Sequence, residues 1–139
     1  MTKYELQKMC EDAAVEYARK FQLYKCSADL IDTYIYDEKT GDTIYVTLLQ
    51  SYSTITGVYI YCIDTAIEFD YYSHTSSQHF WKFIKYLREE DMMNVYNIYH
   101  LYKRSDRIVS KDIKFRKAFE DTDFGEILDS IFGEIEEIL

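Results

Sequence analysis

The sequence predicts an α+β domain in which an antiparallel sheet of three to four strands, about residues 30–72, packs against helices. Residues 30–72 contain runs of β-branched and aromatic residues that alternate with polar ones, which is the period of a half-buried strand. The flanking segments repeat apolar residues at spacings of three and four, which is the period of a helix. A chain of 139 residues has the size of one domain, so we expect a single domain over residues 1–139.

An N-terminal helix is expected from Thr2 to near Lys25. Thr2-Lys-Tyr-Glu5 matches a capping box, in which two side chains satisfy backbone N–H groups at the start of a helix. Four strands follow, and the polar residues 37–42 suit a hairpin loop between the first two. The expected strands are Leu30–Tyr36, Thr43–Leu49, Ile55–Ile63 and Ala66–Tyr72.

A C-terminal set of three to four helices is expected after the sheet. A polar linker from Ser73 to Ser77 precedes the first of them, Asp91 is placed to cap the second, and Ser110 begins a short third one. Asp123-Phe-Gly-Glu126 is another capping box, followed by an apolar stripe. The stripe consists of Phe124, Ile127, Leu128, Ile131, Ile135 and Ile138.

Strand parity predicts two unlike faces of the sheet. The aliphatic face needs a helical cover, and its members are Ile31, Thr33, Ile35, Ile44, Val46, Leu48, Val58, Ile60, Cys62, Ile67 and Phe69. The opposite face carries the tyrosines Tyr34, Tyr36, Tyr45, Tyr59, Tyr61 and Tyr72 with Asp32, Glu68 and Asp70. Tyrosine suits both a second buried layer and a binding surface. On the second interpretation the predicted binding residues are Tyr34, Tyr36, Tyr45, Tyr59, Tyr61, Glu68 and Asp70.

The net charge of −9 is unevenly distributed along the chain. Two acidic segments, 26–72 and 120–139, flank a basic one, 73–119. The basic segment either pairs with the acidic segments or binds nucleic acid directly, and the overall charge disfavours direct binding. No apolar run is long enough for a membrane span or a signal peptide, so a cytoplasmic location is expected. Cys10, Cys26 and Cys62 have no metal-site spacing and are expected to be small buried residues.

Catalytic motifs are weak throughout the sequence. Asp70, His74 and His79 are close enough in sequence to suggest a metal site, but no further ligand accompanies them. Asp112-Ile-Lys114 matches a nuclease fragment of only three residues, and Glu68 and Asp70 form a carboxylate pair on one strand face. No glycine-rich phosphate loop occurs. We therefore expect no catalytic residues, no metal and no cofactor.

Small size, acidity and a tyrosine-bearing sheet predict a non-enzymatic inhibitor that binds a protein, and the acidity favours a partner with a basic nucleic-acid-binding groove. In composition the chain resembles the small inhibitors that phages encode against host defence, such as anti-CRISPR proteins. This resemblance is to a type of protein and includes no motif. The alternatives are a toxin-neutralising immunity protein, a nucleotide-binding sponge and a metal-dependent nuclease or nucleotide enzyme. The sequence leaves the oligomeric state open.

Overall fold

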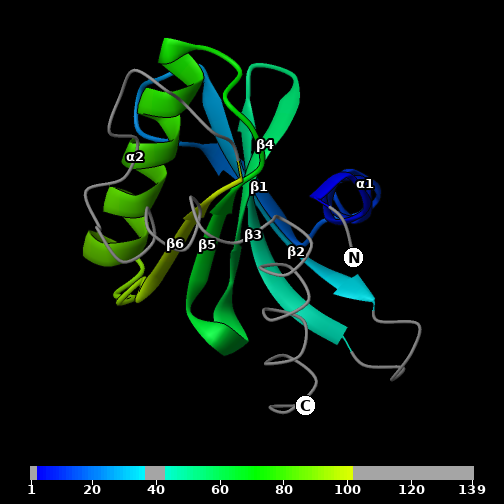
Figure 1. Cartoon of the computed structure of the whole chain (residues 1–139). Helices are drawn as coiled ribbons and strands as arrows, with labels where there is room; N and C mark the ends of the chain where they lie inside the picture. The colour runs from blue at the N-terminus through cyan, green and yellow to red at the C-terminus, as the bar shows by residue number, and fades with distance from the viewer. Residues whose placement is uncertain (1–2, 37–42, 102–139) are drawn as a thin grey trace.

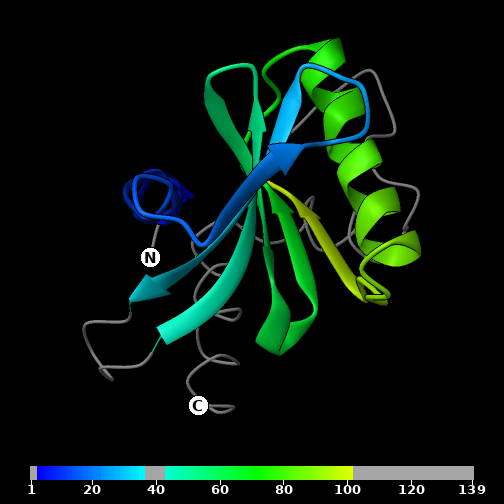
Figure 2. The same ribbon diagram turned by 180° about the vertical axis from the view of Figure 1, so that it is seen from behind.

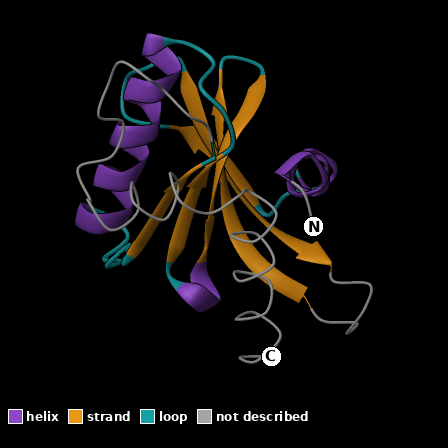
Figure 3. Cartoon of the chain, viewed as in Figure 1, coloured by secondary structure: helices purple, strands orange, loops and turns teal. Residues whose placement is uncertain are grey.

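Six strands form one mixed sheet with a helix on each side of it (Figures 1 and 3). This architecture comes from a computed structural model, which describes residues 3–36 and 43–101. The elements in chain order are α1 (Lys3–Ala13), β1 (Arg19–Gln22), β2 (Ala28–Tyr36), β3 (Thr43–Ser51), β4 (Thr54–Ile60), the 3₁₀-helix η1 (Tyr61–Ile63), β5 (Thr65–Glu68), α2 (His74–Glu89) and β6 (Asn97–His100).

The order of the strands in the sheet follows their order in the chain. Strands β1 to β5 form an antiparallel meander, and β6 joins β5 in parallel after a connection that contains α2. β2 and β3 are paired along their whole length, up to Tyr36 opposite Thr43. β1 is shorter and covers only Asp29–Asp32 of β2. The far end of β2 therefore has a strand neighbour on one side only among the described residues.

The predicted sheet of three to four strands and the predicted C-terminal set of three to four helices are both wrong. Residues 19–22 were assigned to the N-terminal helix, but the helix ends at Ala13 and these residues form β1. Residues 97–100 were assigned to a helix begun by Asp91, but they form β6 beside β5. A strand of four residues is too short for its alternation to be separated from helical spacing, and its pairing partner determines its conformation. The expected helices beyond residue 102 and the hairpin loop lie outside the described residues.

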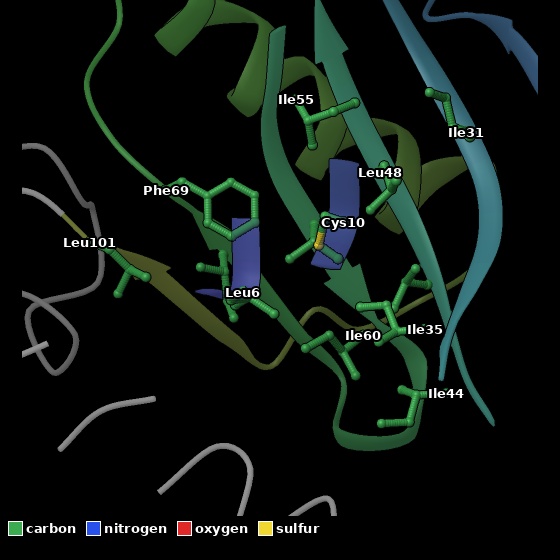
Figure 4. Packing of buried hydrophobic residues seen from close by; sticks show 13 residues of the cluster. Leu6, Cys10, Ile31, Ile35, Ile44, Leu48, Ile55, Ile60, Phe69 and Leu101 are labelled. Atoms are coloured by element: carbon green, nitrogen blue, oxygen red, sulfur yellow. The ribbon is translucent and has the colours of Figure 1, made fainter. Parts of the chain in front are cut away.

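Helix α1 covers the aliphatic face of the sheet, which is confirmed as a core face (Figure 4). Leu6 and Cys10 of α1 are fully buried in this cluster. A bulge between Leu49 and Gln50 shifts the register of β3 against β4, so that Ile55 faces α1 although its parity differs from that of Val58. Burial also raises the pKa of the Cys10 thiol well above its ordinary value, so this cysteine behaves as an apolar residue.

Helix α2 packs on the opposite face of the sheet, as the two views from front and back show (Figures 1 and 2). Its buried residues include Phe80, Phe83, Ile84 and Leu87. Phe80 lies against the bare backbone of Gly57, where an added Cβ would be 3.2 Å from the ring. The helix begins at a cap in which Ser73 Oγ accepts a hydrogen bond from the Ser76 N–H.

Candidate functional site

Helix α2 covers only part of the tyrosine-bearing face. Tyr59 on β4 is buried beneath it with 0% exposure. The end of the β2–β3 hairpin instead projects beyond both helices (Figure 2). Tyr34, Tyr36 and Tyr45 stand on this projecting end with 52%, 58% and 69% of their surface exposed. We refer to these three residues as the tyrosine patch.

The strand register brings the patch together. Tyr34 lies directly opposite Tyr45 on the same face of the sheet, and Tyr36 is two residues further along β2. The rings of Tyr34 and Tyr45 meet edge to face, with centroids 6.3 Å apart. Their strands are anchored from behind, because Ile35, Ile44 and Val46 are in the core. The patch is thus a cluster of large aromatic side chains on a fixed backbone.

A cavity of about 480 Å³ adjoins the patch. This volume is in the range of sites that take a small molecule or a large side chain. Three tyrosine rings contribute to its lining, together with one carboxylate. The lining residues are Ala18, Asp32, Thr33, Tyr34, Tyr45, Val46 and Tyr61.

A chain of polar contacts fixes one wall of this cavity. Arg19 donates from Nε and pairs through Nη2 with Asp32 Oδ2, both at 2.9 Å. Thr47 Oγ1 donates to Asp32 Oδ1 at 2.8 Å and lies 2.8 Å from the Tyr61 hydroxyl, which donates to Asp91 Oδ2 at 2.7 Å. Burial raises the pKa of Tyr61 well above its ordinary value, and the Asp91 carboxylate acts in the same direction. Tyr61 therefore remains a neutral hydroxyl in a defined position.

The other residues predicted for binding lie elsewhere. The buried Tyr59 donates its hydroxyl proton to the Asp64 carboxylate. Glu68 is 1% exposed and lies 2.8 Å from Nδ1 of the buried His100. Asp70 lies past the end of β5, away from the patch, where it accepts a hydrogen bond from the Tyr71 N–H.

Of the seven predicted binding residues, the structure therefore groups Tyr34, Tyr36 and Tyr45 with Tyr61 beside them, and it separates Tyr59, Glu68 and Asp70 from that group. The sequence analysis missed Arg19 and Asp91, because both were assigned to helices. The sequence did indicate which part of the tyrosine-bearing face a helix can cover. Ala28, Gly57 and Ala66 are small residues on it, and a helix can approach a sheet closely where side chains are small, as Phe80 of α2 does at Gly57.

The residues considered for a metal site do not converge. His79 Nδ1 lies 2.7 Å from Ser51 Oγ, and His74 Nε2 lies 3.1 Å from the Gln78 amide. Within residues 3–36 and 43–101, no group of three His, Cys, Asp or Glu side chains is arranged so that it could hold a metal ion. The Asp112–Lys114 fragment is outside the described part of the chain.

Ser51 and His79 also resemble a nucleophile and its base, but they are part of the core. Ser51 is 2% and His79 3% exposed, and Ser51 Oγ lies 2.9 Å from Ser76 Oγ as well. Burial lowers the pKa of His79, and the nearby Lys82 adds to this effect. These contacts attach the first two turns of α2 to the end of β3.

Comparison with protein-family models, with curated proteins and with solved structures finds no match to this chain. Neither of the two described helices is long and apolar enough to cross a membrane.

Proposed function

We propose that this chain is a small acidic inhibitor that binds a partner protein through the tyrosine patch and catalyses no reaction. The observation that carries the proposal is the presence of three aromatic side chains, each more than half exposed, on one projecting hairpin. Exposed apolar clusters of this kind are typical of interaction sites. Tyrosine is enriched among the residues that dominate binding energy, because it buries a large area and loses few rotamers.

Charge supports a partner with a basic surface. The six residues that connect Tyr36 to Thr43 contain three carboxylates and one lysine, and the whole chain carries −9. Opposite charge speeds the encounter with a basic groove of the kind that binds nucleic acid, and it disfavours other partners. We propose a nucleic-acid-handling defence protein as the target, in a host cytoplasm. A nuclease toxin has a similar surface, so an immunity protein is the alternative.

The proposal is tested by affinity capture with two matched variants. The first variant replaces the patch (Tyr34→Ser, Tyr36→Ser, Tyr45→Ser). The control replaces three tyrosines that are similarly exposed but lie elsewhere (Tyr4→Ser, Tyr52→Ser, Tyr96→Ser), with exposures of 67%, 61% and 70%. We expect the wild type and the control to retain one partner at one-to-one stoichiometry from a lysate of bacteria that carry defence systems. The patch variant should lose it.

The captured partner is then purified, and its affinity and activity are measured with each variant. Loss of a single central aromatic residue typically costs about 2 kcal/mol or more, so the triple variant should bind at least about a hundredfold more weakly. Inhibition should fall in parallel. Equal loss of binding in the patch variant and the control would contradict the proposal, as would a purified protein that carries bound nucleotide and no protein partner.

A further inference from the structure

Within residues 3–36 and 43–101, no strand pairs with the outer edge of β2 beside the tyrosine patch. Leu23 N–H donates to the Ala28 carbonyl and Ala18 N–H to the Asp32 carbonyl, both at 2.9 Å. Backbone groups on one side of an antiparallel strand recur at every second residue. The next groups that point outward therefore belong to Tyr34 and Tyr36, and no strand within the described residues pairs with them.

Two cavities adjoin this edge. One is lined mainly by residues of the tyrosine-bearing face, and the other mainly by the end of α1, which covers the opposite face. The cavity of about 480 Å³ lies on the α2 side. A second cavity, of about 370 Å³, lies at the end of α1. Tyr34 lines both cavities, so both adjoin the same stretch of β2. The second cavity is otherwise lined by Asp12, Ala13, Val15 and Glu16.

We infer that the edge from Thr33 to Tyr36 accepts an extended segment of the partner protein, which adds to the sheet as a further strand next to β2. This inference rests on the proposed function and specifies how that partner is bound. Strand addition satisfies the outward N–H and C=O groups of Tyr34 and Tyr36 with main-chain hydrogen bonds. Successive side chains of the added strand then point to opposite sides of the sheet and reach the two cavities in turn.

The linings of the cavities specify the side chains of the incoming strand. Asp12 and Glu16 place two carboxylates at the α1-side cavity, and Asp12 already pairs with Lys8 at 3.1 Å. Glu16 is therefore the carboxylate at which a lysine or arginine of the partner would be favoured. The tyrosine-lined cavity favours a large apolar side chain. The occupant is therefore a segment in which basic and apolar residues alternate. A second copy of this chain is disfavoured, because edge-to-edge pairing would bring two sets of these carboxylates together on molecules that each carry −9.

A capped heptapeptide with phenylalanine at positions 1, 3, 5 and 7 and arginine at 2, 4 and 6 serves as the probe. Its control contains the same residues with the three arginines consecutive. Affinity is measured by fluorescence anisotropy, and hydrogen exchange of the protein amides is followed by NMR with each peptide. The expected result is slowed exchange at Tyr34 and Tyr36 with the alternating peptide and about tenfold weaker binding of the control.

A pair of protein variants separates main-chain pairing from contact with the ring. Tyr36→Ala and Tyr36→Pro both remove the ring, but only proline removes the outward N–H. Proline is tolerated on an edge strand where its N–H would face away from the sheet, so both variants should fold, which thermal melting checks. Tyr36→Pro should bind the alternating peptide about tenfold more weakly than Tyr36→Ala, the effect of one lost hydrogen bond and an obstructed edge.

Equal affinity for the two variants, or exchange at Tyr34 that the alternating peptide does not slow, would overturn the inference. Self-association of the free protein, with protection of the same amides at rising concentration, would also overturn it by identifying a second copy as the occupant. These outcomes are distinct from failure of the proposed function. If the tyrosine patch captures a partner but peptides leave the edge amides unchanged, only the strand-addition inference fails.

Discussion

The division of the tyrosine face leads to a sharp contrast between two substitutions on adjacent strands. Tyr59→Ala removes a ring that is fully buried under α2, whereas Tyr45→Ala removes one that is 69% exposed. Both residues were predicted to lie on one surface, so the pair also tests where that surface ends. We expect Tyr59→Ala to destabilise the fold strongly and Tyr45→Ala to leave it nearly intact.

The expected magnitudes follow from burial and hydrogen bonding. Truncation of a fully buried aromatic side chain to alanine costs about 3–5 kcal/mol. Tyr59→Ala also removes the hydroxyl that donates to Asp64, which adds about 1 kcal/mol. The sum is about 4–6 kcal/mol, a large part of the 5–15 kcal/mol that is typical of a domain's stability. Tyr45→Ala loses chiefly its cross-strand contact with Tyr34, worth about 0.2–1 kcal/mol.

Urea unfolding followed by circular dichroism measures both free energies. Tyr59→Phe provides a milder variant if Tyr59→Ala does not fold, since it removes only the hydroxyl and should cost about 1 kcal/mol. The slope of the free energy of unfolding against urea concentration should be the same for all variants, which shows that the same folded and unfolded states are being compared. A Tyr45→Ala loss as large as that of Tyr59→Ala would refute the assignment of Tyr45 to an exposed patch.

Substitutions at three further positions test contacts elsewhere in the fold. Gly57→Ala places a methyl group 3.2 Å from the Phe80 ring and should cost about 1–3 kcal/mol in urea unfolding. Asp64→Ala should lower the free energy of unfolding by about 2–4 kcal/mol, because the Asp64 carboxylate accepts hydrogen bonds from two backbone N–H groups of the segment leading into β6. Asp64→Asn should cost less in the same assay, because asparagine tolerates the left-handed φ of 47° at this position. The pKa of His79 is lowered on folding, so its contribution to stability is complete above its ordinary value of 6.5 and is lost as the pH falls below that value. Thermal melts from pH 7.5 to 5 should accordingly show a smaller loss for His79→Asn than for the wild type.

The aliphatic core face was predictable because the alternation of apolar and polar residues that indicates it extends over long strands. The alternation that predicted the strands covers seven residues each, Leu30–Tyr36 and Thr43–Leu49, and these lie inside the nine-residue strands β2 and β3. A period of two over that length has no helical equivalent. β1 and β6 have four residues each, and their strand conformation depends on pairing with β2 and β5. That pairing is a tertiary contact, so local spacing alone assigned both segments to helices.

The sequence predicted which tyrosines share one face of the sheet, but it did not predict which of them are exposed. Parity alone placed Tyr34, Tyr45 and Tyr59 on one face, and the structure keeps them there. Which of them is exposed depends on where α2 crosses the sheet, and that position is set by contacts such as Phe80 against Gly57. Periodicity describes one strand at a time and cannot locate such a contact.

The alternation along β2 has a consequence for which residues can be substituted without loss of the fold. Ile31 and Ile35 hold the strand in the core, while Tyr34 and Tyr36 on the opposite side make no contribution to that cluster. On the proposed function, folding and recognition depend on different, alternating residues of the same nine-residue strand. Residues at positions 34, 36 and 45 can be exchanged for others of similar strand preference without repacking the core. If the tyrosine patch binds a partner as proposed, its specificity can therefore change by substitution on this hairpin while the fold is retained.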